Sequence, residues 1–137
     1  MTLVADASVI VKIHVAEQGS DAAIRVVAGD TIEAPDIVLA ELGNVAWRLH
    51  RKGAIGWKQA ERLVGNSPGL FARLWPVEPL IGRGLEIARD LDHSIYDCLY
   101  PALSDRLGAP LITADRRLLA RVRGTPRQAS AMDLYTL

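Results

Sequence analysis

Cysteine, lysine and long apolar runs are all scarce in this sequence of 137 residues. The single cysteine, Cys98, excludes an internal disulfide framework and a cysteine-rich zinc site. No apolar run approaches the roughly 18 residues that a membrane span needs, so no membrane association is expected. The start of the chain, Met1 to Asp6, has no basic segment before its first acid, and we therefore expect no signal peptide and a cytoplasmic location.

An excess of charge of one sign is also missing, because 16 basic residues balance 16 acidic residues. Bulk charge therefore does not mark a nucleic-acid-binding protein. The basic residues are unevenly chosen, since only Lys12, Lys52 and Lys58 are lysines and all the others are arginines. Arginine suits bidentate contacts to phosphate and carboxylate, although a compositional bias of the coding sequence would produce the same pattern.

Apolar surface is what the sequence has in quantity, because hydrophobic residues make up 50% of it. A chain of this length and composition is expected to form one domain, residues 1–137, with a substantial core. Short apolar runs that favour buried strands alternate with longer segments of helical periodicity. This alternation predicts an α/β protein, a three-layer α/β/α sandwich with a mainly parallel sheet.

Prolines, glycines and capping residues set the expected element boundaries. Pro76 places one strand near an edge of the sheet, and Asp36 is expected to cap the helix that follows it. The helices over 37–52 and 57–64 are expected to form a protruding helical hairpin. The expected strands are Leu3–Ala5, Thr31–Ala34, Leu74–Val77, Leu111–Thr113 and Gln128–Ser130, and the other expected helices are 9–14, 20–29, 80–91, 95–107 and 115–122.

Four acidic residues stand at similar places in these elements. Asp6 and Asp115 each follow a buried strand, whereas Glu41 and Asp97 lie early in helices. In a doubly wound sheet, strand ends and helix starts lie on the same edge, so the four carboxylates are expected to converge. Each acid also has a purely structural interpretation, as a helix cap or as a member of a solvated first turn.

Converging carboxylates repel one another, and a divalent cation would relieve that repulsion. Oxygen ligands without a histidine or cysteine set favour Mg²⁺, with Mn²⁺ as a substitute, over zinc. Such a cation can activate water for attack on a phosphodiester. His14, His50 and His93 show no ligand spacing, so the expected site contains no histidine.

Four short blocks resemble, in order, the motifs of one nuclease family. They are Leu3–Ser8, Ala40–Asn44, Tyr96–Tyr100 and Thr113–Leu119. Together they look like the motif blocks of PIN-domain ribonucleases, and within that family the chain most resembles the VapC-type toxins of bacterial toxin–antitoxin pairs. The resemblance covers nearly the whole chain, and it is the order of the four blocks that makes it specific.

The resemblance implies a metal-dependent endoribonuclease toxin of PIN-like fold. Its catalytic and metal-binding acids would be Asp6, Glu41, Asp97 and Asp115, and hydroxyl groups of Ser8 and Thr113 would line the substrate site. Members of the family are usually homodimers that a VapB-type antitoxin inhibits, as heterotetramers or larger assemblies. Trp47 and Trp57, around the helical hairpin, could bury the antitoxin or dimer surface.

Basic residues beside the acids are candidates for holding RNA phosphates, which dominate nucleic-acid affinity. Arg116 and Arg117 adjoin Asp115, and Lys12 follows Asp6 on the first helix. A solvated helix face would account for the same arginines, and a lysine that covers apolar surface would account for Lys12.

One residue departs from the family pattern. Pro101 stands four residues after Asp97 in the same expected helix, where it would clash with the Asp97 carbonyl group. A kinked helix or a later helix start would accommodate it. The departure leaves room for a PIN-like interaction protein that has lost catalysis.

A Mg²⁺-binding phospho-acceptor domain is a further alternative, because such domains also set acids around a cation at strand ends. A receiver domain needs a lysine late in the chain, and the last lysine here is Lys58. A dehalogenase-like phosphatase needs a second aspartate two residues after Asp6, and that residue is Ser8. The nuclease interpretation therefore accounts for more of the sequence.

Overall fold

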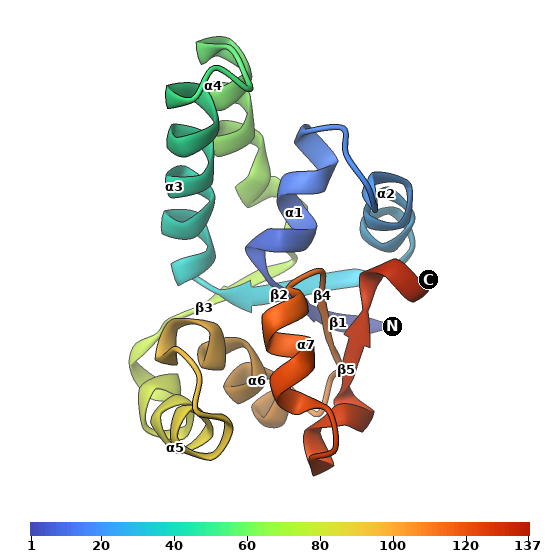
Figure 1. Cartoon of the computed structure of the whole chain (residues 1–137), viewed down its shortest axis with the longest axis vertical. Coiled ribbons are helices and arrows are strands. Elements are labelled where there is room, and N and C mark those ends of the chain that lie inside the picture. The colour runs from blue at the N-terminus through green and yellow to red at the C-terminus, as the bar shows by residue number, and fades with distance from the viewer.

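A five-stranded, fully parallel sheet organises the fold, with the strand order β3-β2-β1-β4-β5 (Figure 1). The structure, a computed structural model, describes all residues 1–137. The first strand lies at the centre, and both halves of the sheet grow outward from it. The strands are β1 (Thr2–Ala5), β2 (Thr31–Pro35), β3 (Arg73–Trp75), β4 (Leu111–Thr113) and β5 (Ala131–Asp133).

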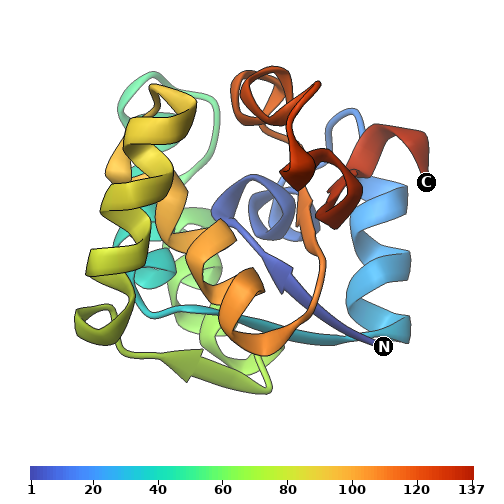
Figure 2. The same ribbon diagram turned by 90° about the horizontal axis from the view of Figure 1, so that it is seen from below.

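Helices cover both faces of this sheet. The α1 to α4 helices lie on one side, and α5 and α6 lie on the other (Figures 1 and 2). The expected three-layer α/β/α sandwich is confirmed. The helices are α1 (Ala7–His14), α2 (Ser20–Gly29), α3 (Ile37–Arg51), α4 (Trp57–Asn66), α5 (Ile81–Leu91), α6 (Ile95–Leu107) and α7 (Arg116–Val122), with 3₁₀ turns at Ser67–Leu70, Glu78–Leu80, Pro126–Ser130 and Leu134–Thr136. None of these helices combines the length and the hydropathy needed to cross a membrane.

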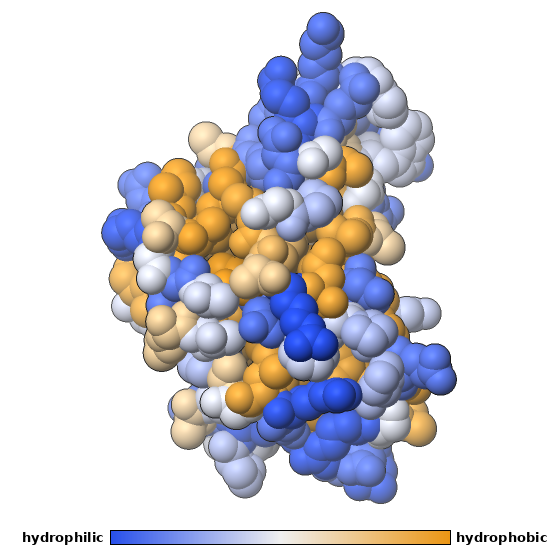
Figure 3. Space-filling model, turned by 180° about the vertical axis from the view of Figure 1, so that it is seen from behind, coloured by the Kyte–Doolittle hydropathy of each residue, from blue (hydrophilic) through white to orange (hydrophobic).

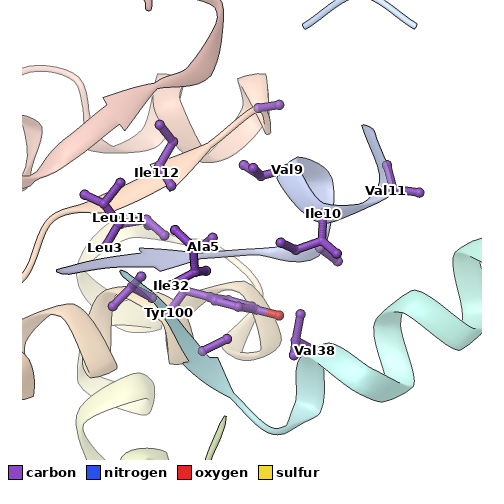
Figure 4. Packing of buried hydrophobic residues seen from close by; sticks show 14 of the residues in the cluster. Leu3, Ala5, Val9, Ile10, Val11, Ile32, Val38, Tyr100, Leu111 and Ile112 are labelled. Atoms are coloured by element: carbon purple, nitrogen blue, oxygen red, sulfur yellow. The ribbon is translucent and has the colours of Figure 1, made fainter. Parts of the chain in front are cut away.

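The core forms around β1, because its neighbours β2 and β4 shield both of its edges. Val4 and Ala5 are fully buried, as is Ile112 of the neighbouring strand. Figure 4 shows these strands packed against the start of α1 and against the ring of Tyr100. The Tyr100 hydroxyl group reaches the rim of this core, towards the start of α3, and thus connects the core to the site described below.

The α3 and α4 helices form a hairpin that projects from the body of the molecule, as expected (Figure 1). The end of the hairpin is strongly hydrophilic, and apolar side chains gather below it on the face that Figure 3 shows. Trp47 and Trp57 lie on the two helices and are 51% and 54% exposed. Their exposure is unusual for tryptophan and is typical of a surface that a partner covers.

Several boundary predictions were wrong, and the structure gives the reason for two of them. Residues Gln128–Ser130 form part of a 3₁₀ turn, and the last strand begins at Ala131. Thr125 caps that turn by accepting a hydrogen bond from the Arg127 backbone N–H, which delays the strand. Asp36 makes no capping hydrogen bond from its side chain, because its backbone is already helical, and its backbone N–H donates to Trp75 of β3 instead.

The helix that contains Pro101 begins at Ile95, as expected, and is continuous to Leu107. Ser94 caps α6 by accepting a hydrogen bond from the Tyr96 N–H, and the helix continues to Leu107. Pro101 is buried in its interior, and Asp97 stays in the first turn. The proline therefore does not turn Asp97 away from the carboxyl edge of the sheet.

We predict that Leu103→Ala in α6 lowers the free energy of unfolding by about 2–5 kcal/mol, since Leu103 is fully buried and its loss leaves a cavity. Leu85→Ala in α5 is the matched control, because Leu85 is 62% exposed and should change stability by less than about 0.5 kcal/mol. Urea denaturation of both variants measures the difference. Equal losses in the two variants would contradict the core described here.

Candidate functional site

The first part of the site is the turn between β1 and α1. Asp6 caps α1, since its Oδ1 accepts a hydrogen bond from the Ser8 N–H at 3.0 Å and another from the Ser8 hydroxyl group. Its Oδ2 accepts a hydrogen bond from the hydroxyl group of Thr113, the last residue of β4. Ser8 Oγ in turn accepts from the Ala114 N–H at 2.9 Å. Hydrogen bonds thus join the ends of two neighbouring strands.

The second part is the turn between β4 and α7. Asp115 caps α7 by accepting hydrogen bonds from the N–H groups of Arg117, at 2.9 Å, and Leu118, at 3.2 Å. Its own N–H donates to Thr113 Oγ1 at 2.9 Å. Asp6 and Asp115 are therefore both helix caps and, because β1 and β4 are parallel neighbours, they lie on the same edge of the sheet.

Helices α3 and α6 supply the other two acids. Glu41 of α3 accepts a hydrogen bond from the Tyr100 hydroxyl group, which fixes one of its oxygens. Asp97 of α6 lies with its Oδ2 atom 2.9 Å from Nε2 of His93. Each carboxylate therefore has a partner that holds it in place.

All four carboxylates open on one cavity of about 370 Å³. Each acid comes from a different part of the fold. Asp6 follows β1, Asp115 follows β4, Asp97 lies at the start of α6 and Glu41 lies near the start of α3. Positive charge is limited to two side chains of the wall, of which Lys12 is 3.0 Å from Glu17 and thereby partly neutralised. The lining residues that carry charge are Asp6, Lys12, Glu17, Glu41, Arg48, Asp97 and Asp115.

Burial and mutual repulsion raise the pKa values of the acids in this cavity. Burial raises the pKa of Asp6 to about 7, and the charges of Asp115 and Glu41 add to the rise, against the hydrogen bonds from Ser8 and Thr113. Burial is also the main reason why the pKa values of Glu41 and Asp97 are raised, with neighbouring carboxylates next. A bound cation would remove this repulsion, so the electrostatics of the cavity suit a positively charged ligand.

Three of the side chains lie close enough to share one cation. A ring nitrogen of His93 and one carboxylate oxygen each of Asp97 and Asp115 all lie within 4.8 Å of one another. Oxygen and imidazole nitrogen donors both bind divalent metal ions, so the donor set fits such an ion. Asp6 and Glu41 line the same cavity but lie outside this group of three.

The sequence predicted a site without histidine, but His93 lies beside two of its acids. His93 stands four residues before Asp97, and its side chain is only 7% exposed. The spacing was visible in the sequence, but the three histidines show no ligand pattern among themselves. A search for histidine one helical turn from a candidate acid would have found it.

Two predicted substrate residues lie where a substrate cannot reach them freely. Thr113 is fully buried below Asp6 and does not line the cavity. Lys12 lines the cavity, but its ammonium group is paired with Glu17 and lies 5.3 Å from the centre of the Tyr135 ring. Ser8 is in the cavity wall, with its hydroxyl group engaged by Asp6.

The two arginines beside Asp115 face different surroundings. Arg116 stacks on the ring of Tyr135, with 4.3 Å between its guanidinium carbon and the ring centre. Arg117 lines a second cavity of about 270 Å³, which shares Asp97 and Asp115 with the first. Arg48 of the hairpin reaches the wall of the main cavity, a placement that its position on α3 did not reveal from the sequence alone.

Several classes of protein combine a parallel sheet with acids gathered at its carboxyl edge, and sequence comparison identifies the family of this chain. Residues 3–124 match the PIN domain family, so the chain belongs to the PIN-domain proteins. Within that family, its curated relatives carry VapC names, and the chain is a VapC-type PIN-domain protein.

Three relatives illustrate this similarity. Ribonuclease VapC12 of Mycobacterium tuberculosis is 30% identical over 85% of this chain and 88% of its own length. Ribonuclease VapC3 of Pyrobaculum aerophilum is 29% identical over 86% of this chain and 92% of its own length. A third protein, named exonuclease VapC9 and also from Pyrobaculum aerophilum, is 30% identical over 74% of this chain and 70% of its own length.

Two solved structures share the fold. PAE2754 from Pyrobaculum aerophilum superposes with a TM-score of 0.71 and 26% identity, over 99% of this chain and 85% of its own. VapBC-1 from nontypeable Haemophilus influenzae superposes with a TM-score of 0.60 over 98% of both chains, and its 18% identity makes it evidence for the fold alone.

We predict that the metal-free protein loses stability between about pH 4 and pH 7 because of Asp6. Its carboxyl group has a pKa of 3.8 in an unfolded chain and of about 7 in the folded protein. The folded state therefore favours the protonated form, so this contribution is complete below the unfolded pKa and is lost as the pH rises through about 7. The loss is on the order of 4 kcal/mol, and urea denaturation in a chelating buffer measures it.

The variant Asp6→Asn isolates this carboxyl group, and we expect its stability to change less over the same range. His14, whose pKa burial lowers, acts in the opposite direction but is present in both proteins. Asp90→Asn, on the exposed face of α5, should keep the decline. An identical pH dependence in the wild type and in Asp6→Asn would rule out the proposed origin.

Proposed function

We propose that this chain is a divalent-metal-dependent endoribonuclease, the toxin of a toxin–antitoxin pair. The observation that carries the proposal is the cavity onto which four carboxylates from four elements open, with raised pKa values for Asp6, Glu41 and Asp97. A protein that used these acids only for structure would gain nothing from placing them together, because their repulsion opposes folding. The ribonuclease names of the relatives agree with the proposal.

The acids of the cavity would hold Mg²⁺, or Mn²⁺ in its place. Asp97 and Asp115 each have a carboxylate oxygen within 4.8 Å of the other's, and Asp6 and Glu41 complete the acidic lining. When bound, the cation would activate water and stabilise the oxygen that leaves the phosphodiester. The protein contributes fixed geometry, since Ser8 holds Asp6 and Tyr100 holds Glu41.

Arginines around the cavity would bind the RNA backbone. Arg48 lines the main cavity, and Arg117 lines the adjoining one that shares Asp97 and Asp115. Guanidinium groups on two sides of the acids suit a strand whose phosphates continue past the cleaved bond. Arg116, stacked on Tyr135, and Lys12, paired with Glu17, would join them after small side-chain movements.

We also propose a VapB-type antitoxin as the partner, and a homodimer that binds it as a heterotetramer or a larger assembly. The Haemophilus influenzae structure that shares this fold is named VapBC-1. The exposed Trp47 and Trp57 line an apolar cavity of about 390 Å³ between α3 and α4, together with Val64. An apolar groove of this kind is suited to an apolar partner segment.

We predict that the purified, partner-free chain cleaves a circular RNA when Mg²⁺ or Mn²⁺ is present. A circular substrate has no ends, so its cleavage distinguishes an endonuclease from an exonuclease, the activity in the name of one relative. Asp97→Asn and Asp6→Asn should lower the cleavage rate by at least about 100-fold, because losing even an outer-shell partner of a metal ligand costs up to about 100-fold. Gel analysis of the linear product over time measures the rate.

The control is Asp90→Asn, which removes an exposed acid of α5 that lines neither cavity and should leave the rate unchanged. Equal cleavage by the wild type and the two cavity variants would show that the activity is a contaminant and would refute the proposal. Degradation of linear RNA alone would instead make the protein an exonuclease.

A further inference from the structure

A histidine lies against the acids of the site, and the function proposed above gives it no role. Nε2 of His93 lies 2.9 Å from Oδ2 of Asp97, and Asp115 completes the group of three donors. We propose that Nε2 of His93 binds the same cation as Asp97 and Asp115, so that this nuclease has a mixed nitrogen and oxygen site that prefers Mn²⁺ to Mg²⁺. The inference rests on the proposed function, because it assumes that a cation binds there.

The distances suit ligands of one ion. Metal-to-ligand distances of about 2.0–2.1 Å place two donors on opposite sides of an ion roughly 4.2 Å apart, and adjacent donors closer. The three donor atoms lie within 4.8 Å of one another, and the pair from His93 and Asp97 is at 2.9 Å. Contraction by a few tenths of an ångström would therefore bring all three onto one ion.

The backbone holds His93 in this place. Asp92 ends α5 in a left-handed conformation, with φ of 48°, and the His93 N–H donates to the Ala88 carbonyl group at 3.1 Å. Ser94 then caps α6, so only three residues separate the two helices. The imidazole ring is fixed between two packed helices, and binding an ion would cost little side-chain entropy.

The surroundings leave room for the rest of the coordination sphere. The second cavity, of about 270 Å³, is lined by His93, Asp97 and Asp115, and it also reaches Arg117 and Arg121. Water molecules or a phosphate oxygen can therefore approach an ion from this side as well as from the main cavity. Arg117 and Arg121 lie one turn apart on α7 and would face that phosphate.

A nitrogen ligand changes which metal the site prefers. Mg²⁺ strongly favours oxygen donors, whereas imidazole raises the affinity for transition metals along the first row. Replacing one oxygen by the His93 nitrogen therefore favours Mn²⁺ relative to Mg²⁺. A histidine that only oriented Asp97 through a hydrogen bond would not change this preference and would keep its nitrogen off the ion.

Pulsed electron paramagnetic resonance of Mn²⁺ bound to the full-length protein distinguishes the two roles. We expect modulation from a directly coordinated ¹⁴N nucleus in the wild type and its loss in His93→Gln, whose amide can still donate to Asp97. His50→Gln is the matched control, because His50 lies on the hairpin with its ring near the Ile55 carbonyl group, and it should keep the signal. The Mn²⁺ dissociation constant should rise at least about 10-fold in His93→Gln, and the Mg²⁺ constant should rise less.

The outcomes separate this inference from the proposed function. Mn²⁺ that binds, with an affinity that Asp97→Asn weakens but without nitrogen modulation, overturns the role of His93 as a ligand and leaves the nuclease proposal intact. A wild type that binds Mg²⁺ but not Mn²⁺ overturns the inference alone, and failure to bind either ion overturns both. His93→Asn serves as a second variant if His93→Gln is misfolded by circular dichroism, and its retention of the nitrogen signal would overturn the inference.

Discussion

The hydrogen bond from the Thr113 hydroxyl group to Asp6 is the contact on which the site depends. It joins the ends of the two central strands, and both of its residues are buried. The same hydroxyl oxygen accepts the Asp115 N–H, so a single threonine places two acids on the same edge of the sheet. The parallel pairing of β1 and β4 makes this possible, because it brings both strand ends to one side.

This arrangement has a cost in stability that a bound cation can offset. Asp6 is buried with a pKa raised to about 7, and other carboxylates lie around the same cavity. Hydrogen bonds from Ser8 to Asp6 and from Tyr100 to Glu41 offset part of the cost of burying these carboxylates, but they cannot neutralise the charge. Strongly shifted pKa values are typical of functional sites, and the function proposed for these acids is the binding of a divalent cation.

The sequence was sufficient for the fold class, because alternating short apolar runs and amphipathic segments permit few arrangements besides a parallel sheet between helices. The placement of the acids followed from their positions at strand ends and helix starts. The contacts of Tyr100 and Arg48 were not foreseen, because they join segments far apart in the sequence. His93 was missed although it stands only four residues before Asp97, a spacing that the sequence shows. The late start of β5 was missed for a similar reason, since a cap at Thr125 outweighed local strand propensity.

Anomalous diffraction from crystals of the protein grown with Mn²⁺ tests the central claim most directly. The account predicts a single strong manganese peak between Asp97 and Asp115, within bonding distance of their oxygens and of Nε2 of His93, with Asp6 and Glu41 facing it. A cavity without manganese at saturating concentration, or a peak elsewhere on the surface, would contradict the claim that these acids are gathered to hold a cation.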